Sequence, residues 1–157
     1  MKRAAVLFCL VACVAAHAFA GERGPVAPSA KDKCPVCGMF VKKYPDWTSQ
    51  IVFKDGSYAL FDGAKDMFKY YLGLKKYNPS HTSADIDSIY VIDYYSMRPI
   101  DGFKADYVIG SDVYGPMGRE LIPFIKSDEA KEFMKDHKGR TIFRFNDVTP
   151  EALKGLD

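Results

Sequence analysis

The chain has few cysteines, and their number limits the class of protein it can be. Four cysteines occur among its 157 residues, and only Cys34 and Cys37 lie beyond the apolar N-terminal run. A single Cys-x-x-Cys pair closes a loop too small to stabilise a whole domain. The sequence therefore excludes a disulfide scaffold of the kind found in small secreted proteins.

The chain also lacks a surplus of charge of either sign. It carries 22 basic and 20 acidic residues, and two of the basic residues are Lys2 and Arg3 at the N-terminus. If residues 1–20 are removed as a leader, 20 residues of each sign remain. Because a nucleic-acid-binding domain shows a basic surplus, we expect no nucleic-acid partner.

No apolar run reaches the length of about 18 residues that a membrane-spanning helix needs. The longest run, "AAVLFCLVACVAA", follows the basic start "MKR" and precedes "AFA" at residues 18–20. A positive start, a short apolar stretch and an Ala-x-Ala motif are typical of a signal peptide. Residues 1–20 are therefore predicted to be a signal peptide that is cleaved before Gly21.

A second mode of export is open for the same segment. "LVAC", from Leu10 to Cys13, resembles a bacterial lipobox, in which Cys13 would be lipidated and would hold the protein on a membrane. The residues after Cys13 are mostly apolar, whereas polar residues more often follow a lipobox cysteine. This favours ordinary cleavage over lipidation.

The rest of the chain divides into a linker and two similar units. Residues 21–33 are rich in Gly, Pro and small polar residues, which predicts a flexible linker. The first unit spans residues 34–102 and begins with the Cys-x-x-Cys-Gly-Met segment, and the second spans residues 103–157. Both are predicted to run strand, strand, helix, strand. The fold class is therefore α+β, with two small ββαβ modules in tandem and a duplication as their expected origin.

In the first unit, two apolar runs flank Asp55 and Gly56, the strongest short signal for a β-hairpin. A helix is predicted near residues 63–73, with Asp62 as its N-cap. "SIYVIDYY" is predicted to be the third strand. The helix has one apolar face at helical spacing, made of Ala64, Met67, Phe68, Tyr71 and Leu72.

In the second unit, the strand-like runs "ADYVIGSDV" and "RELIPFI" flank the loop "YGPMG". A helix is predicted near residues 128–138, capped by Ser127. "RTIFRF" closes the unit as a strand with Thr141, Phe143 and Phe145 on one face. The helix has an apolar face made of Ala130, Phe133, Met134 and His137.

The Cys34 and Cys37 pair has three ordinary interpretations. A zinc site needs four ligands, and the only histidines beyond the leader, His81 and His137, lie far off at none of the zinc-finger spacings. We interpret His137 as a residue at the edge of the core and His81 as a solvated loop residue. A thioredoxin-like redox pair needs a helix after its first cysteine, but Gly38 and β-type residues follow. A plain disulfide stays open, because export leads to an oxidising compartment.

Copper(I) fits the residue types better. It is a soft ion that prefers thiolate and thioether sulfur, and Cys34, Cys37 and Met39 place three sulfurs within six residues. Met117 is a candidate fourth ligand, because it lies between Pro116 and Gly118 in a tight loop. Methionines on the helix faces are interpreted as core residues. The predicted metal site is therefore Cys34, Cys37, Met39 and Met117.

No motif indicates catalysis. The chain has no Gly-rich phosphate loop followed by a helix, no nucleophile elbow and no HExxH helix. We therefore expect a binding protein that is not an enzyme. The alternative is an exported structural or redox module with a Cys-x-x-Cys disulfide, or a zinc-binding protein.

The motifs "CPVCGMFV", "FDGAKDMFKYY", "YVIGSDVYGPMGRELIPF" and "FMKDHKGRTIFRF" together resemble the NosL family of nitrous oxide reductase accessory proteins. The resemblance covers nearly all of the chain after the leader. It implies a periplasmic Cu(I)-binding protein of two ββαβ modules that supplies copper during maturation of nitrous oxide reductase, commonly as a lipoprotein. Its partners would be that enzyme and its copper-assembly membrane complex. Carried over residue by residue, it implies Cys37, Met39 and Met117 as ligands, with Cys34 beside them.

Overall fold

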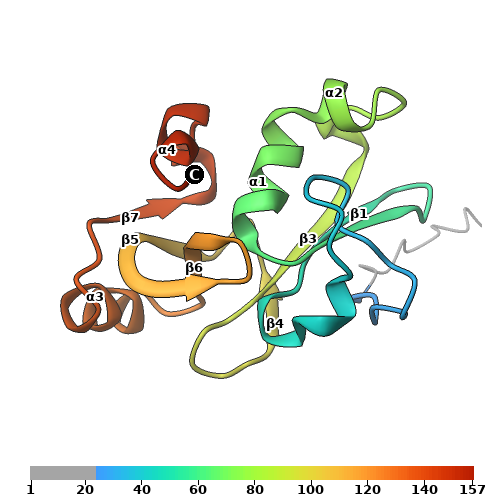
Figure 1. Ribbon diagram of the computed structural model, residues 1–157. Helices are drawn as coiled ribbons and strands as arrows, with labels where there is room; N and C mark the ends of the chain where they lie inside the picture. The colour runs from blue at the N-terminus through green and yellow to red at the C-terminus, as the bar shows by residue number, and fades with distance from the viewer. Residues whose placement is uncertain (1–23) are drawn as a thin grey trace, which may run out of the picture.

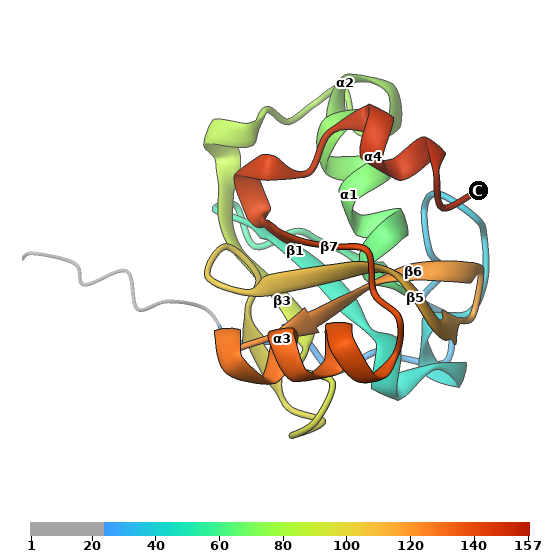
Figure 2. The ribbon, with the colours of Figure 1, turned by 90° about the vertical axis from the view of Figure 1, so that its left-hand side faces the viewer.

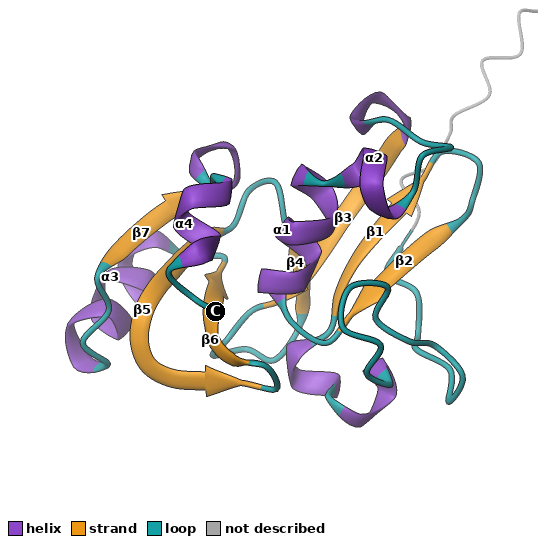
Figure 3. Ribbon diagram, turned by 45° about the horizontal axis from the view of Figure 1, so that its top comes forward, coloured by secondary structure: helices purple, strands orange, loops and turns teal. Residues whose placement is uncertain are grey.

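The computed structural model describes residues 24–157. The predicted signal peptide, the lipobox at Cys13 and the cleavage site before Gly21 lie outside these residues. The described part of the chain forms two antiparallel sheets with helix α1 between them (Figures 1 and 3). It contains no helix that is both long and apolar enough to cross a bilayer.

The first sheet has the strand order β2-β1-β3-β4. Gly56 has a φ of 91° and donates its N–H to the Phe53 carbonyl at 2.9 Å, so the predicted hairpin at Asp55 and Gly56 is confirmed. A positive φ is a conformation that favours glycine. The strands are β1 (Ser49–Phe53), β2 (Tyr58–Phe61), β3 (Ile86–Ile92) and β4 (Pro99–Asp101).

The second sheet has the order β6-β5-β7 and repeats the arrangement of the first. In each sheet the first strand is central and pairs with its hairpin partner on one side and with the strand after the helix on the other. The predicted α+β fold with a ββαβ order in both units is confirmed, and the duplication stays a prediction. The strands are β5 (Asp106–Gly115), β6 (Gly118–Phe124) and β7 (Thr141–Arg144).

The two longer helices lie where the sequence predicts them. They are α1 (Ala64–Leu72) and α3 (Ser127–Asp136), and the shorter helices are α2 (Leu74–Tyr77) and α4 (Pro150–Lys154). Short 3-10 helices complete the described chain at Val41–Lys43, Pro45–Trp47, Ser83–Asp85 and Phe145–Asp147.

Both predicted N-caps are wrong by one residue. Gly63 is the N-cap of α1 and Lys126 is the N-cap of α3, and neither makes a side-chain capping bond. The two polar side chains expected there are bonded elsewhere. Asp62 accepts a hydrogen bond from the Cys37 thiol, and the Ser127 hydroxyl donates to Asp106.

The apolar face of α1 is also rotated relative to the prediction. Leu72 is 40% exposed, whereas Tyr70, which is not among the predicted apolar-face residues, is buried. Tyr70 packs between the rings of Phe61 and Tyr77, at 5.1 and 5.7 Å. The helix therefore buries more of its circumference than a surface helix does, because strands flank it on two sides.

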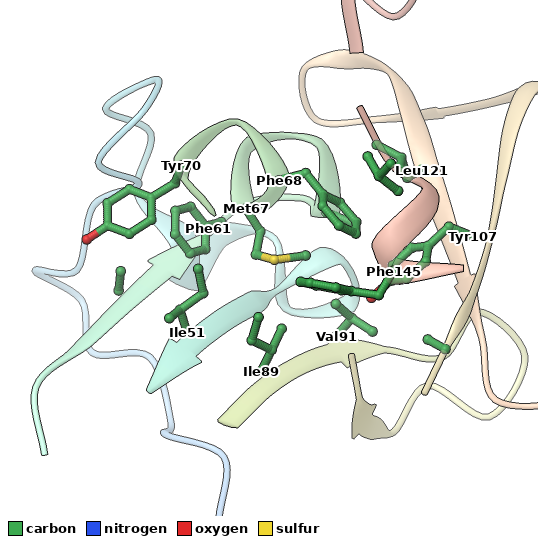
Figure 4. Close-up of a cluster of buried hydrophobic side chains, with 14 of the residues drawn as sticks. Ile51, Phe61, Met67, Phe68, Tyr70, Ile89, Val91, Tyr107, Leu121 and Phe145 are labelled. Carbon is green, nitrogen blue, oxygen red and sulfur yellow. The ribbon is translucent and has the colours of Figure 1, made fainter. Parts of the chain in front are cut away.

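A single large core joins the two predicted modules. The Phe68 ring of α1 contacts Tyr107 of β5 and Phe145 beyond β7, both at a centroid distance of 4.9 Å (Figure 4). The boundary near residue 102 therefore separates two sequence units that share one buried cluster.

The second sheet is covered on both faces. Figure 2 shows α3 and α4 on opposite sides of it. Alternation along the strands explains this, because Tyr107 and Ile109 face the large core while Val108 belongs to a smaller cluster under α3. The members of that smaller cluster are Val108, Ile122, Phe124, Ala130 and Phe133.

Part of the segment predicted as a flexible linker is attached to the first sheet. The buried side chain of Gln50 accepts from the Val26 N–H at 2.7 Å and donates to the Val26 carbonyl at 2.9 Å. The side-chain amide of glutamine can bond to both the N–H and the carbonyl of one residue, because it carries both a donor and an acceptor. The described portion of residues 21–33 therefore has a fixed point at Val26.

Candidate metal centre

The two cysteines lie in a tight loop that closes on itself. The Cys34 N–H donates to the Met39 carbonyl at 2.8 Å, and the Gly38 N–H donates to the Cys34 carbonyl at 2.9 Å. Gly38 has a φ of 81°, so the turn needs a residue that tolerates the left-handed region. The loop therefore brings Cys34 and Cys37 close together by local geometry alone.

Asp66 of α1 and Asp62, which precedes the helix, add two carboxylates to the thiols. Cys34 Sγ donates to Asp66 Oδ2 at 3.3 Å, and Cys37 Sγ donates to Asp62 Oδ1 at 3.1 Å. One ligand atom from each of these four residues lies within 4.8 Å of the others. We refer to Cys34, Cys37, Asp62 and Asp66 as the Cys–Asp cluster.

Burial keeps both thiols protonated at neutral pH. Cys34 is 1% exposed, and its burial raises the pKa of its thiol far above the ordinary value. Burial also raises the pKa of Cys37 to about 12, and the carboxylate of Asp62 acts in the same direction. The thiols consequently remain hydrogen-bond donors to the carboxylates until something removes their protons.

One polar atom of the cluster lacks a partner. Oδ2 of Asp62 is buried, and it accepts no hydrogen bond from any of residues 24–157. A buried polar atom without a partner costs free energy, so such atoms are rare unless a ligand, an ion or water serves them. This atom makes the cluster a stronger candidate for a metal site than paired carboxylates and thiols alone.

The structure tests the three ordinary interpretations of the cysteine pair. Both cysteines are free, so the thiols bond to carboxylates rather than to each other. The loop continues into a short 3-10 helix at Val41–Lys43, and no α-helix starts at Cys34, as the sequence predicts. The count of zinc ligands from the sequence omits Asp62 and Asp66, whose carboxylates lie beside the two thiols and could complete a set of four.

The predicted methionine ligands lie on two different elements. Met39 is half-buried in the cysteine loop. Met117 is 44% exposed in the turn between β5 and β6, and its carbonyl accepts from Lys65 Nζ at 2.9 Å. Because Lys65 lies between Asp62 and Asp66 on the chain, the fold brings the Met117 turn to the end of α1 that carries the cluster.

Sequence reasoning missed Asp62 and Asp66. Both lie close together in "DGAKD", with Asp66 in the first turn of α1 and Asp62 just before its N-cap Gly63, and this clustering of acidic residues is the only local signal. Nothing local indicates that this face meets the cysteine loop, which is 25 residues from Asp62 and 32 from Asp66 along the chain.

The histidines lie outside the cluster. His137 packs on the Phe133 ring at 4.4 Å, and its Nδ1 lies 3.1 Å from Asp112, which agrees with a place at the edge of the core. The interpretation of His81 as a solvated residue is wrong. Its ring packs on Phe53 at 4.2 Å, and its Nε2 lies 3.0 Å from the Asp55 carboxylate.

Comparisons with known proteins agree on one family. The NosL family profile matches residues 25–153. The copper-binding lipoprotein NosL of Stutzerimonas stutzeri is 30% identical over 138 residues, which cover 83% of this chain and 68% of that protein.

Two solved structures are similar as well. The crystal structure of the copper chaperone NosL from Shewanella denitrificans gives a TM-score of 0.69 at 21% identity, over 83% of this chain and 98% of that one. The solution structure of apo-NosL from Achromobacter cycloclastes gives 0.48 at 27% identity, over 67% and 87%. The Shewanella denitrificans structure has the same fold, and the NosL family profile matches most of this sequence. This chain therefore belongs to the NosL family.

Proposed function

We propose that this protein binds Cu(I) as cargo and passes it to a copper-requiring target, without catalysing a reaction. The ligands would be Cys34, Cys37, Met39 and Met117. The observation that carries the proposal is the pair of free thiols held within 4.8 Å of each other in a loop that also contains a methionine.

The donor set fits a soft ion. Thiolate and thioether sulfur select Cu(I), and this ion accepts low coordination numbers. The carboxylates of Asp62 and Asp66 are hard ligands, and their hydrogen bonds instead hold the two sulfurs in place before the metal arrives. The hydrogen bonds therefore keep the two sulfurs in place, and the metal does not need four protein ligands in a fixed geometry.

Delivery would proceed by ligand exchange. Cys34 is almost fully buried, whereas the Met117 side chain is 44% exposed. A partner that offers sulfur or imidazole ligands would reach the exposed side of the site first and replace the thioether there. The thiolates would follow, because they are the stronger and less accessible ligands.

The proposal also specifies a target protein and a cellular location. The target would be nitrous oxide reductase, reached through its copper-assembly membrane complex, in the periplasm. The similarity to a copper-binding lipoprotein and to a copper chaperone supports export and copper delivery. A lipid anchor would place Cys13 at the mature N-terminus.

Zinc is the second candidate, because two thiols and two carboxylates within 4.8 Å are ligands that zinc also accepts. The relatives described as copper proteins favour copper.

The deciding experiment is anaerobic titration of the reduced protein with Cu(I) and, separately, with Zn(II). Stoichiometric Cu(I) binding with a sulfur-to-copper absorption band supports the proposal. X-ray absorption then counts sulfur, nitrogen and oxygen neighbours. Failure to bind Cu(I), or binding through oxygen alone, would overturn it.

A further inference from the structure

Two buried ionisable side chains connect α1 to the β5–β6 hairpin. Lys65 of α1 and Glu120 of β6 are both almost fully buried, which is unusual for these residue types. Glu120 contacts the backbone of α1, and Lys65 contacts the turn of the β5–β6 hairpin. Oε1 of Glu120 accepts from the Lys65 backbone N–H, and Nζ of Lys65 donates to the Met117 carbonyl at 2.9 Å. We call this pair of contacts the Lys65–Glu120 clasp.

The Glu120 side chain lies against two glycines, at positions where any larger residue would clash with it. A Cβ atom on Gly63 would lie 2.1 Å from Oε2 of Glu120, and one on Gly115 would lie 3.1 Å from its Cγ. The glutamate therefore occupies space left by two glycines. It also serves the N-terminus of α1, where Gly63 provides no side-chain cap and the Lys65 N–H would otherwise lack an acceptor.

The Lys65 ammonium group makes two hydrogen bonds and one ion pair. Besides Met117, Nζ donates to the Leu156 carbonyl at 3.2 Å and lies 3.9 Å from the Asp157 carboxylate. Breaking these contacts would leave a buried charge without partners, which is strongly unfavourable. The Met117 turn is thus fixed to α1 at the stretch between Asp62 and Asp66.

We infer that Lys65 and Glu120 are positioning residues that hold Met117 where its thioether can reach the Cys–Asp cluster. This inference rests on the proposed function for its copper role. Neither residue touches the metal. The Met117 side chain is exposed and lies on a two-residue turn, so its backbone attachment is what limits its position.

The test compares Lys65→Leu with Lys69→Leu in the full mature chain, because leucine, unlike methionine, adds no thioether beside the copper site. Lys69 is a matched control, because it lies on the same helix and forms an ion pair with the same Asp157, whereas only Lys65 donates to the Met117 carbonyl among residues 24–157. We expect Lys65→Leu to weaken Cu(I) binding by about 10-fold to 100-fold, as changes to residues that orient a metal ligand typically do. X-ray absorption should count one sulfur fewer. Lys69→Leu should keep both the affinity and the sulfur count.

A double-mutant cycle excludes a merely structural effect. If Lys65 acts through Met117, adding Lys65→Leu to Met117→Leu should not weaken Cu(I) binding further. Fully additive losses, or an unchanged sulfur count in Lys65→Leu, would overturn the inference.

Gly63→Ala provides a second route if Lys65→Leu does not fold. The added methyl group displaces the Glu120 carboxyl group without removing an ionisable side chain, and the extended φ of −177° at Gly63 allows alanine. We expect the same loss of affinity and of one sulfur. A Gly63→Ala protein with wild-type copper coordination would contradict the role of Glu120.

A copper-free measurement separates this inference from the proposed function. Methyl NMR of labelled methionine in the apo protein should show a more mobile Met117 in Lys65→Leu and an unchanged Met117 in Lys69→Leu. A wild-type protein that binds no Cu(I) overturns the proposed function, whereas an unchanged Met117 signal in Lys65→Leu overturns the clasp.

Discussion

The Cys37 thiol donates a hydrogen bond to the Asp62 carboxylate across 3.1 Å, and the two residues are 25 positions apart. The contact joins a tight loop to the residue just before α1. It places a soft ligand beside a hard proton acceptor in a half-buried site. The metal chemistry proposed for this chain depends on that pairing and on its counterpart between Cys34 and Asp66.

Replacing Cys37 by serine should abolish tight Cu(I) binding. A hydroxyl group cannot replace a soft anionic ligand for this ion. The side chain is only half-buried, so the free energy of unfolding should change by roughly 1 kcal/mol. Chelator competition measures the affinity and chemical denaturation measures the stability. A Cys37→Ser protein that holds copper as tightly as the wild type would place the metal elsewhere.

Copper affinity should rise steeply with pH. Both thiols are protonated near neutrality, since burial raises the pKa of Cys37 to about 12 and that of Cys34 further. Each thiol that becomes a ligand must release one proton, which makes the affinity rise about tenfold per pH unit. Two ligand thiolates therefore give about 100-fold per unit between pH 7 and 9. A tenfold slope in chelator competition would mean that only one cysteine binds, and a flat profile would contradict thiolate ligation.

Replacing Met117 by leucine should separate metal binding from stability. The two side chains have nearly the same volume, so the free energy of unfolding should fall by less than about 1.5 kcal/mol. Cu(I) affinity and copper transfer should both be weaker, because the thioether sulfur is lost. His137→Gln is the control and should leave copper affinity unchanged. The opposite pattern would replace the sulfur ligand by the His137 imidazole.

Glu120 should make the protein less stable as the pH rises. Burial raises the pKa of this carboxyl from 4.5 to about 8, so between these values the folded state binds more protons than the unfolded state. The free energy of unfolding should then fall with increasing pH by up to about 1.4 kcal/mol per unit, with the full stability present below pH 4.5. Urea denaturation at several pH values should show this slope in the wild type and lose it in Glu120→Gln. Parallel curves for the two proteins would be evidence against the buried carboxyl as its source.

The N-terminus of the exported protein should be Gly21. Intact mass of protein exported from its native host gives the answer directly, because cleavage and lipidation differ by the mass of the retained residues and the acyl chains. A lipid-modified Cys13 as the first residue would show that the lipobox is used instead.

Local signals in the sequence determined the elements of the fold. The turn at Asp55 and Gly56 and the helical spacing of apolar residues predicted the first hairpin and both longer helices, because such patterns depend on neighbours a few residues apart. The closeness of Cys34 and Cys37 is equally local. Their spacing and Gly38 suffice to close the loop.

Only the tertiary structure decided what surrounds the thiols. Asp62 was predicted as an N-cap and Tyr70 was left out of the predicted apolar face, since nothing in their immediate sequence indicates that a loop or a second ring will pack there. The same holds for Glu120, whose contact with the Lys65 N–H spans 55 residues. Partners this far apart meet only when the core around Phe68 assembles, because burial of apolar surface, which is non-directional, brings the elements together and the polar contacts then fix their positions.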